Sequence, residues 1–593
     1  MNEFILPDGD YLDDHLDFIP ENKVIYKTLT GCGATHLELN SNRNSILIEP
    51  YIPVIKGKAS SKVFPVHGGV HATKVVEHFQ KYKGNFKFVS TPEGHKTIKE
   101  AAATCGVDLY KDFFLLVDEC EKLIQDVNFR PKIISVMEDF FKYDNRSFIS
   151  ATPIQPSDPR FTDYGFRNYY IVPELKRDIK LHLRITNNLG TSIIDHFKHN
   201  RNNRHIIFLN STERIASVIK LMKIENEAQV FCAVDSAEKL NIAGIANAQE
   251  DFDAERMMKY NFFTSRFFTA FDMILKYKPS VLIVSDVKKI SHSAVDPSTD
   301  VIQIIGRARN GVTDITHITN IDPGLKSKNE TEVREYLNGV QFAYQTFKNF
   351  RDTTNMMGAF DVLNDALKLS AFTDYISEDG ESINHFMIDR EVHINRIRGY
   401  YNSSENLLNA YRFTKRFLCC VRIEEYNLED KTIDKLQQGI SEKEVMQVIC
   451  EALEEHFQAV KGVYFLSPDY TLYHIIQTHN RIYKYYNALG IARIRELGYR
   501  PDLIQREYEG LAETSGIKYF QMLASLKHIF RRVKRANAAK IHKILKFYFN
   551  KYNITSLRPT VQQLQKWFNM YRTTAGYDGN VEIKIWVIES PKF

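Results

Sequence analysis

Short apolar runs alternate with helix-like amphipathic stretches through roughly the first half of the chain. One set of runs covers residues 24–26, 45–48, 86–89, 113–117 and 147–150. After Pro173 a second set covers residues 205–209, 229–233, 261–264, 280–284 and 317–319. Strands that alternate with helical crossovers build parallel sheets with helices on their faces. The pattern therefore predicts an α/β protein with two tandem parallel-sheet domains.

The last third of the chain has a helical pattern instead. Residues 329–350 and 442–460 are long amphipathic stretches rich in Tyr, Phe, Leu, Lys and Glu. A chain of 593 residues is also too long for one hydrophobic core. We therefore expect a first sheet domain at 1–175, a second at 176–328, and a mainly helical region of one or more domains at 329–593.

Composition narrows the class of protein. The seven cysteines form no CxxC or Cys/His pattern, which argues against structural zinc and fits a reducing compartment. The sequence shows no apolar signal core and no apolar run of membrane-spanning length. We expect a soluble, cytoplasmic protein without a membrane partner. The net charge of +5 neither requires nor excludes nucleic acid, because a local basic surface matters more than the total.

An acidic pair gives the first indication of chemistry. Asp118 and Glu119 directly follow the apolar run 113–117. In open α/β sheets ligands bind at the carboxyl ends of the strands, so this pair would face a ligand crevice. Nucleotide-hydrolysing enzymes use such a pair, one acid to bind Mg²⁺ and the other to orient the attacking water.

A glycine-rich turn follows the first apolar run, but it lacks a lysine. Phosphate-binding loops commonly read Gly-x-Gly-Lys-Thr, whereas this chain reads Gly31-Cys32-Gly33-Ala34-Thr35. The glycines still allow close approach of the backbone to phosphate, and Thr35 remains available as a Mg²⁺ ligand. Lys27, just before the turn, is the candidate for the missing positive charge. The alternative is that Lys27 is a solvated residue at the end of a strand.

The order of motifs resembles that of the superfamily-two, DEAD-like helicases over about residues 23–320. The acidic segment Asp118-Glu119-Cys120-Glu121 stands where that family has its Asp-Glu-x-Asp/His box, and Ser150-Ala151-Thr152 matches its Ser-Ala-Thr motif. Farther along, Gln303-x-x-Gly306-Arg307-x-Arg309 matches the arginine-finger motif. Weaker matches are Pro50, Thr91, Thr264 with Ser265, and Asp272.

The resemblance implies two RecA-like domains that bind ATP and Mg²⁺ in the cleft between them. It implies that Gly31 and Gly33 hold phosphate, that Thr35 and Asp118 hold Mg²⁺, and that Glu119 is the general base. Gln303 would help to position the water, Arg307 and Arg309 would reach the γ-phosphate, and Asp272 would lie near the ribose. Contacts to a nucleic-acid strand are implied for Pro50, Thr91, Thr264 and Ser265, and coupling of that grip to closure is implied for Ser150 and Thr152.

A basic cluster lies in the C-terminal third. If residues 527–535 form one helix, Lys527, Arg531, Lys534 and Arg535 share a broad face. Such a face suits phosphate contacts, and we assign Arg531 and Arg535 to nucleic-acid binding. The competing interpretation is an ordinary solvated face. The helical region is also a candidate for binding a protein partner.

The sequence thus predicts an ATP-dependent helicase or translocase acting on DNA or RNA, which we expect to be single-stranded. A microbial, phage or mobile-element setting fits the compact architecture and the divergent loop. Because Ala34 replaces the loop lysine, two alternatives stay open. One is a helicase-like scaffold that binds nucleic acid without hydrolysis, and the other is a nucleotide-dependent assembly factor with a protein partner.

Overall fold

The structure is a computed structural model of the chain, which divides into two compact units, Met1–Glu425 and Tyr426–Phe593. It describes residues 3–28, 30–174, 179–200, 204–269, 271–376, 382–426, 430, 436, 440–460, 475–514, 516–578 and 581–593. Within these ranges no helix combines the length and the apolar character needed to cross a bilayer.

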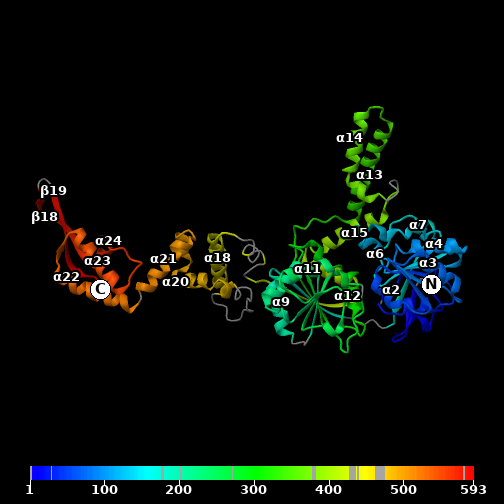
Figure 1. Cartoon of the computed structure of the whole chain (residues 1–593), viewed down its shortest axis with the longest axis horizontal. Coiled ribbons are helices and arrows are strands. Elements are labelled where there is room, and N and C mark those ends of the chain that lie inside the picture. The colour runs from blue at the N-terminus through cyan, green and yellow to red at the C-terminus, as the bar shows by residue number, and fades with distance from the viewer. Residues whose placement is uncertain are drawn as a thin grey trace. The chain divides into compact units, whose positions relative to one another are not determined.

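The first unit contains two parallel sheets, and the first sheet is built entirely from residues before 175 (Figure 1). Its strands, in spatial order, are β1 (Glu3–Leu6), β8 (Arg167–Pro173), β2 (Lys23–Tyr26), β7 (Asn145–Ser150), β6 (Phe114–Asp118), β3 (Ser45–Ile48), β5 (Lys87–Ser90) and β4 (Val63–Val66). Apolar side chains form one cluster on each face, with Leu115 and Phe148 in one and Leu116 and Ile149 in the other. Residues that alternate along each strand therefore feed two cores, as expected for a sheet covered by helices on both faces.

The second sheet repeats this design. Its strands, in spatial order, are β12 (Ala248–Gln249), β11 (Ala228–Phe231), β13 (Tyr260–Phe263), β10 (His205–Leu209), β14 (Val281–Ser285), β15 (Ile315–Thr319), β9 (Ile179–Thr186) and β16 (Phe417–Glu424). Apolar clusters again cover both faces. The two RecA-like domains predicted from the sequence are thus present.

Strand β16 joins this sheet from far along the chain. It pairs in parallel with β9, and Glu424 at its end forms an ion pair with Arg184 of β9 at 2.7 Å. The second sheet therefore includes a strand that lies almost 100 residues beyond the predicted boundary at residue 328. Between β15 and β16 the chain forms helices that belong to the first unit.

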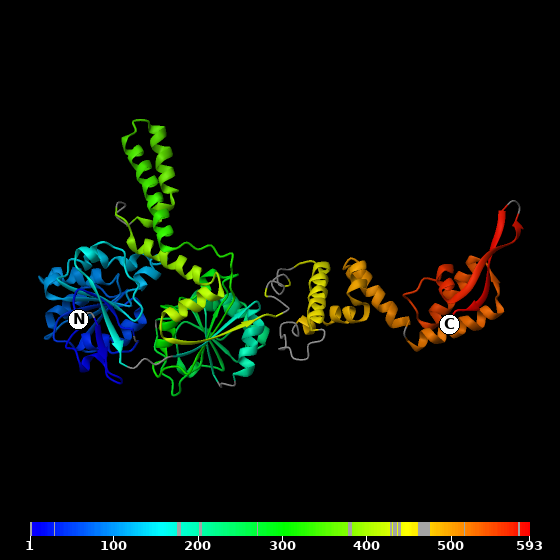
Figure 2. The same ribbon diagram turned by 180° about the vertical axis from the view of Figure 1, so that it is seen from behind.

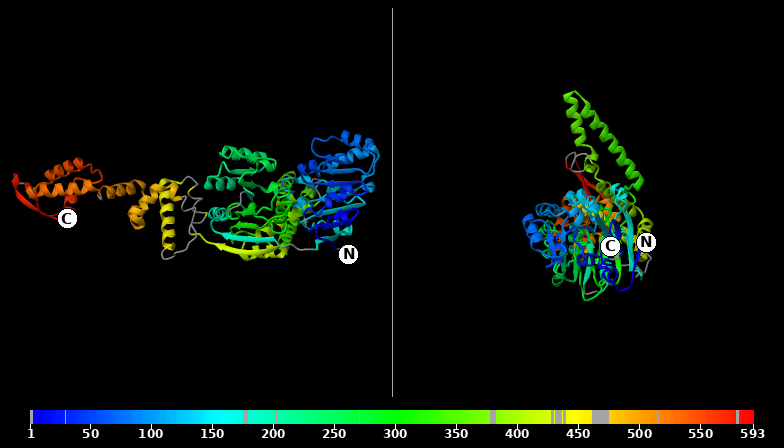
Figure 3. Two further views of the ribbon diagram at one scale, coloured as in Figure 1. Left: turned by 90° about the horizontal axis from the view of Figure 1, so that it is seen from below. Right: turned by 90° about the vertical axis from the view of Figure 1, so that its right-hand side faces the viewer.

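Two of those helices form a hairpin that stands away from both sheets (Figure 3). They are α13 (Glu330–Thr353) and α14 (Met357–Lys368). The next long helix, α15 (His385–Tyr400), contacts the first domain: Asp389 accepts a hydrogen bond from the Ser157 amide at 2.7 Å. Helix α15 thus belongs to the second half of the unit in sequence but contacts the first domain.

The second unit is mainly helical, as predicted, and also contains a small sheet. Its long helices are α18 (Glu442–Val460), α20 (Asn480–Glu496), α21 (Pro501–Thr514), α22 (Ile517–Arg532) and α23 (Ala538–Tyr552). The sheet has the order β17-β19-β18 and is antiparallel, with β17 at Arg535–Ala536, β18 at Phe568–Asp578 and β19 at Val581–Pro591.

The predicted basic helix across residues 527–535 is wrong in part. Helix α22 ends at Arg532, and Arg535 lies in β17, where it pairs with Val587 of β19. Pairing with a distant strand overrides the local helical pattern, because it satisfies the same backbone groups in another way. Lys534 and Arg535 therefore do not share a helical face with Lys527 and Arg531.

Leu545→Ala should destabilise the C-terminal core without affecting the sheets of the first unit. Leu545 is fully buried, and such a truncation costs about 2–5 kcal/mol. The chain has two tryptophans, Trp567 and Trp586, both in this region. We expect the urea midpoint from tryptophan fluorescence to fall in Leu545→Ala and to stay unchanged in the matched core variant Leu116→Ala. If Leu116→Ala lowers the fluorescence midpoint as well, the whole chain unfolds as one cooperative unit.

Candidate nucleotide site

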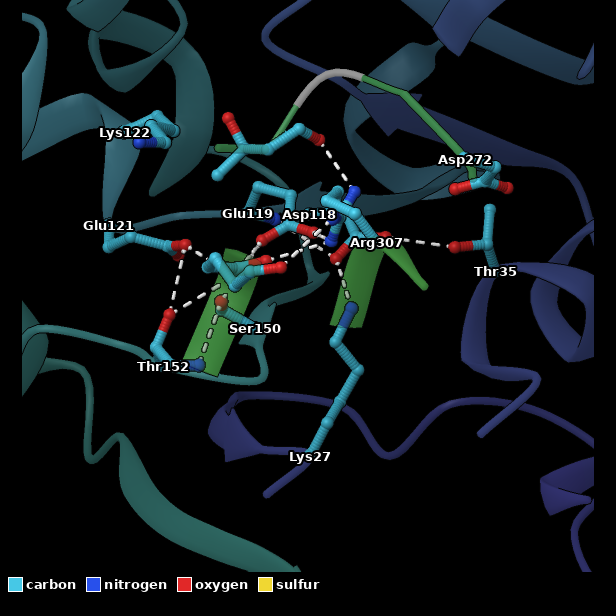
Figure 4. Close-up of polar contacts among 12 residues, drawn as sticks. Lys27, Thr35, Asp118, Glu119, Glu121, Lys122, Ser150, Thr152, Asp272 and Arg307 are labelled. Atoms are coloured by element: carbon cyan, nitrogen blue, oxygen red, sulfur yellow. Dashed lines mark hydrogen bonds and ion pairs between the residues drawn. The ribbon is translucent and has the colours of Figure 1, made fainter. Parts of the chain in front are cut away.

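The carboxylate of Asp118 is the centre of the candidate site. It is the last residue of β6 and is buried, and two residues of the loop region reach it from different sides (Figure 4). Lys27 Nζ donates to Oδ1 at 2.7 Å, and Thr35 Oγ1 donates to Oδ2 at 2.9 Å. Lys27 follows β2 directly, so a neighbouring part of the same sheet positions it. The glycine-rich loop and the acidic segment are thus in direct contact through Thr35 and Asp118.

Charge stabilises this buried pair. Burial works to lower the pKa of Lys27, but the charges of Asp118 and Glu119 outweigh it and raise that pKa above its usual value. Burial works to raise the pKa of Asp118, but the charges of Lys27 and Lys58 outweigh it and hold that pKa below its usual range. Both groups are therefore ionised at neutral pH. The alternative that Lys27 is a solvated strand-end residue is excluded by its burial.

Glu119 reaches across to the second domain. Its Oε2 accepts a hydrogen bond from Gln303 Nε2 at 2.7 Å and another from Ser150 Oγ at 3.3 Å. Its backbone has φ +49°, a left-handed conformation that side chains seldom adopt, and such strain concentrates at functional sites. Gln303 is buried on α12 (Asp300–Arg307) of the second domain. The carboxylate and the amide are therefore brought together from opposite sides of the cleft.

A buried network links the same amide to the Ser-Ala-Thr segment. Gln303 Nε2 also donates to Glu121 Oε1 at 2.9 Å and to Thr152 Oγ1 at 3.1 Å. Thr152 Oγ1 in turn donates to Glu121 Oε1 at 3.2 Å, and the Thr152 amide donates to Ser150 Oγ. Both Ser150 and Thr152 thus connect the acidic box to the second domain.

Two arginines of the second domain occupy the other side of the cleft. Arg307 donates to the Gln303 side-chain oxygen at 2.9 Å and lies 3.9 Å from Glu119 Oε1. Arg309 forms an ion pair with Asp272 at 2.5 Å. A Cβ on Gly31 would lie 3.2 Å from the Arg309 guanidinium, so the glycine loop of the first domain lies against this arginine.

Gly306 shows how close the two domains come. A Cβ at this position would lie 2.3 Å from Thr30 Oγ1 in the glycine-rich loop of the first domain. Only glycine permits this approach, which accounts for the glycine of the Gln-x-x-Gly-Arg motif without any appeal to backbone flexibility. The structure therefore has the cleft in a closed arrangement.

Residues 1–425 contain two parallel-sheet domains of the RecA-like type, which contact each other across a cleft. No protein-family model matches the sequence, and a search of curated proteins finds no match. The solved structures that match include S. cerevisiae Dbp5 bound to RNA and ADP BeF3, at 13% identity over 51% of this chain and 79% of that one, with a TM-score of 0.33.

Two further structures match parts of this chain. A DEAD box protein from Methanococcus jannaschii has 12% identity over 58% of this chain and 86% of that one, with a TM-score of 0.28. The ATP-dependent Type ISP restriction-modification enzyme LlaBIII bound to DNA has 10% identity over 90% of this chain and 39% of that one, with a TM-score of 0.38. With TM-scores below 0.5, these similarities carry no argument about fold or activity. They give the expected phage or mobile-element origin no support.

The cleft between the two domains contains a cavity of about 890 Å³. Residues from both domains line it, including the loop from Thr30 to Thr35, the acids Asp118 and Glu119, and Arg266, Asp272, Arg307 and Arg309. Lys58 also lines it, and this residue was not predicted from the sequence. Lys58 ends α2 (Ile52–Lys58) and forms an ion pair with the buried Glu49. Its approach to the cavity depends on how α2 packs, and no local sequence signal encodes that.

The residues at this cavity fit a magnesium–nucleotide complex. Mg²⁺ prefers oxygen ligands and binds through one or two carboxylates together with phosphates and water. Thr35 and Asp118 present such oxygens side by side, and the described residues hold no larger group of metal-ligating side chains. Several positive side chains border the same space, as a triphosphate requires.

The segments expected to grip nucleic acid lie after three strand ends. Pro50 follows β3 and Thr91 follows β5, and Arg130 joins their loops by donating to the Pro50 carbonyl and pairing with Glu93. In the second domain Thr264 follows β13 and is buried, whereas Ser265 is exposed. Arg531 and Arg535 lie in the second unit, where both are exposed.

Glu121→Gln should remove a pH-dependent loss of stability. Burial, and then the charge of Glu119, raise the pKa of Glu121 to about 8 from an ordinary 4.5. Between these values the folded protein binds a proton that the unfolded chain does not, so its free energy of unfolding falls as the pH rises through this window. The glutamine keeps the acceptor for Gln303 and Thr152 but does not titrate.

We therefore expect Glu121→Gln to match the wild type near pH 4.5 and to exceed its free energy of unfolding by at least about 1 kcal/mol at pH 8. Urea unfolding followed by far-UV circular dichroism at both pH values measures the difference. The exposed Glu100→Gln serves as the control. Equal pH dependence of the wild type and Glu121→Gln would show that Glu121 is ionised in the folded protein.

Proposed function

We propose that this protein is an ATP-dependent helicase or translocase that acts on DNA or RNA and hydrolyses ATP between its RecA-like domains. The observation that carries the proposal is the hydrogen bond from Gln303 to Glu119. A water-orienting pair of this kind exists only while the two domains are in contact. Hydrolysis would therefore be tied to closure of the cleft, which is how a lid or domain movement controls chemistry.

Each side chain has a role that follows from its position. The amides of the Gly31–Gly33 turn would bind phosphate, and Glu119 would accept a proton from water that Gln303 helps to hold. Arg307 and Arg309 would approach the γ-phosphate from the second domain, and Asp272 would release Arg309 for that purpose and lie near the ribose. Thr35 and Asp118 would hold Mg²⁺, which when bound neutralises charge on the phosphates.

Lys27 is our proposal for the charge that the loop lacks. It borders the cavity and is held by Asp118 in the closed cleft. Its ammonium group would supply positive charge to phosphates bound in the cavity, because the two charges attract strongly in a partly buried site. The burial of Lys27 next to the loop supports this proposal, and no sequence motif does.

The nucleic-acid strand would bind to Pro50 and Thr91 on one domain and to Thr264 and Ser265 on the other. Closure would shorten the distance between these two binding surfaces. Ser150 and Thr152 would couple closure to this movement through Glu121 and Gln303. We expect the bound strand to be single-stranded. We expect the protein to work in the cytoplasm. We also propose that the C-terminal helical region binds a protein partner.

Glu119→Gln should reduce phosphate release by about 10²- to 10⁴-fold, the usual contribution of a positioned general base. ATP binding, measured by calorimetry, should stay within a few-fold of the wild type because the amide keeps the size of the side chain. The control is Glu100→Gln on the exposed face of α4 (His95–Cys105). Phosphate release is measured with and without single-stranded DNA and RNA, and no release in any condition would favour the non-hydrolysing scaffold.

Lys27→Met should lower kcat by about 10²-fold or more, the effect of removing one preorganised charged contact from a phosphoryl-transfer site. Lys96→Met, an exposed lysine on α4, is the matched control and should leave kcat unchanged. If Lys27→Met hydrolyses ATP normally, the missing charge comes from elsewhere, and Lys58→Met becomes the next variant to measure.

The assembly-factor alternative makes a different prediction. If the partner is a protein, nucleic acid should not stimulate hydrolysis, and its binding should show no steep loss of affinity with salt. Phosphate contacts must weaken as salt rises, because bound counterions are released on association. A salt titration of DNA and RNA binding therefore separates this alternative from the helicase.

A further inference from the structure

Helix α15 is anchored in the apolar cores of both sheet domains. Phe386, in its first turn, is 3% exposed and belongs to the apolar cluster of the first domain that also contains Phe140. Tyr401, directly after its last turn, is fully buried in a cluster of the second domain. A helix of 16 residues spans about 24 Å, and Figure 2 shows its yellow-green ribbon between the two domains. Each end of α15 is therefore anchored in a different domain.

Polar side chains of α15 also contact both domains. Asp389 accepts a hydrogen bond from the Ser157 amide of the first domain at 2.7 Å. One turn farther along, His393 Nε2 lies 3.5 Å from Gln125 Nε2 of the first domain, and its Nδ1 lies 3.8 Å from Asp296 Oδ2 of the second. His393 thus lies where the helix passes from one domain to the other.

The C-terminal end of α15 is held firmly. Tyr401 Oη accepts a hydrogen bond from the Val295 amide at 3.0 Å and donates one to the Val295 carbonyl at 2.9 Å. Leu407 and Tyr411 of α16 (Ser404–Phe413) are fully buried in the same cluster. Removal of this end would break both hydrogen bonds and expose a large aromatic ring to water. We therefore expect it to stay in the second domain.

The N-terminal end is packed less completely. Phe386 and Met387 line a cavity of about 770 Å³ together with Ile134 and Met137 of the first domain. Side chains that border a void lack contact atoms on one side and so lose part of their dispersion energy. If one end of α15 is to detach, it is therefore this one.

The anchors of α15 lie outside the nucleotide site. Among the described residues that line the cavity of the cleft, none of Phe386, Asp389, His393 and Tyr401 is present. A ligand in that cavity would not contact them, so they stabilise the closed arrangement independently of it. Detachment of Phe386 would expose its aromatic side chain to water, and this cost opposes opening.

We propose that α15 is a strap that holds the two sheet domains together whether or not the cavity is occupied, and that the cleft opens only when the first-domain end of the strap detaches. The second-domain end keeps its place during this movement. Opening therefore requires release of Phe386 and Asp389 in addition to the contacts across the cleft. The inference concerns domain movement and does not rest on the proposed ATP hydrolysis.

The test measures the distance between the domains in the full-length protein without nucleotide, by single-molecule energy transfer between two dyes. The dyes are attached through noncanonical amino acids at the exposed positions 96 and 239, because the chain has seven cysteines of its own. Phe386→Ala should add a population of lower transfer efficiency and raise the ratio of open to closed molecules at least about tenfold. Truncation of a buried phenylalanine costs more free energy than a tenfold change requires.

Phe140→Ala is the matched control, because it truncates another buried phenylalanine of the same cluster outside the strap. It should lower the stability of the first domain, measured by circular dichroism, without changing the distances between the domains. Asp389→Ala leaves the apolar core intact and should shift the distances in the same direction as Phe386→Ala. This second variant decides the test if Phe386→Ala does not fold.

The proposal is overturned if the folded variants Phe386→Ala and Asp389→Ala keep the wild-type distribution of distances. It is also overturned if Phe140→Ala opens the cleft as far as Phe386→Ala does, since the effect would then come from general loss of stability. A wild-type protein that does not hydrolyse ATP would contradict the proposed function but would leave this measurement unchanged.

Discussion

Three carboxylates lie within four residues at the end of one buried strand, and the first unit must neutralise them. Asp118, Glu119 and Glu121 lie where little water can solvate them, so each needs a cation, a donor or a proton. Asp118 has Lys27 and Thr35 from its own domain. Glu119 and Glu121 instead depend on Gln303 from the other domain, and Glu121 also takes up a proton. Ser150 and Thr152 of the first domain also donate to these two acids, so contact between the domains adds the Gln303 hydrogen bonds to a partly satisfied site. Closure and the electrostatics of the site are therefore coupled.

Under the proposed function, lysines outside the loop account for the alanine that stands in place of the loop lysine. A phosphate-binding site needs positive charge near the phosphates, but the charge does not have to come from one backbone position. Lys27 enters from the strand that precedes the loop, and Lys58 enters from the helix that follows the next strand. Each is paired with a carboxylate, Asp118 or Glu49, and is therefore kept in place without a ligand. Burial raises the pKa of Glu49 to about 7, so the pair with Lys58 becomes stronger as the pH rises through that value.

The sequence was sufficient for the parts of the structure that are encoded locally. Runs such as 45–48 and 205–209 became strands because alternation with helices and flanking turn residues specify a parallel sheet. Motif order assigned Glu119 and Gln303 to one cleft, whereas the hydrogen bond between them came only from the structure. Strand β16 was missed because its pairing with β9 depends on residues more than 200 positions away. The end of α22 at Arg532 was missed for the same reason: β19 captures the backbone of Arg535, and propensity alone cannot report a distant partner. Lys58 reaches the cavity through the packing of a helix, which no motif records.

Charge distribution gives the two units different electrostatic characters that the total conceals. A net charge of +5 over 593 residues suggests no particular affinity for a polyanion. The last 78 residues nevertheless carry a large excess of basic side chains, and the remainder of the chain is acidic. In the first unit most of the cations near the cleft are already paired with carboxylates, so they act over short distances on a ligand that enters the cavity. In the last domain few acids are present to screen the basic side chains, so their field extends into solvent over about a Debye length. A long polyanion would therefore be attracted first by the C-terminal domain, whereas selection of a nucleotide would depend on the close geometry of the cleft.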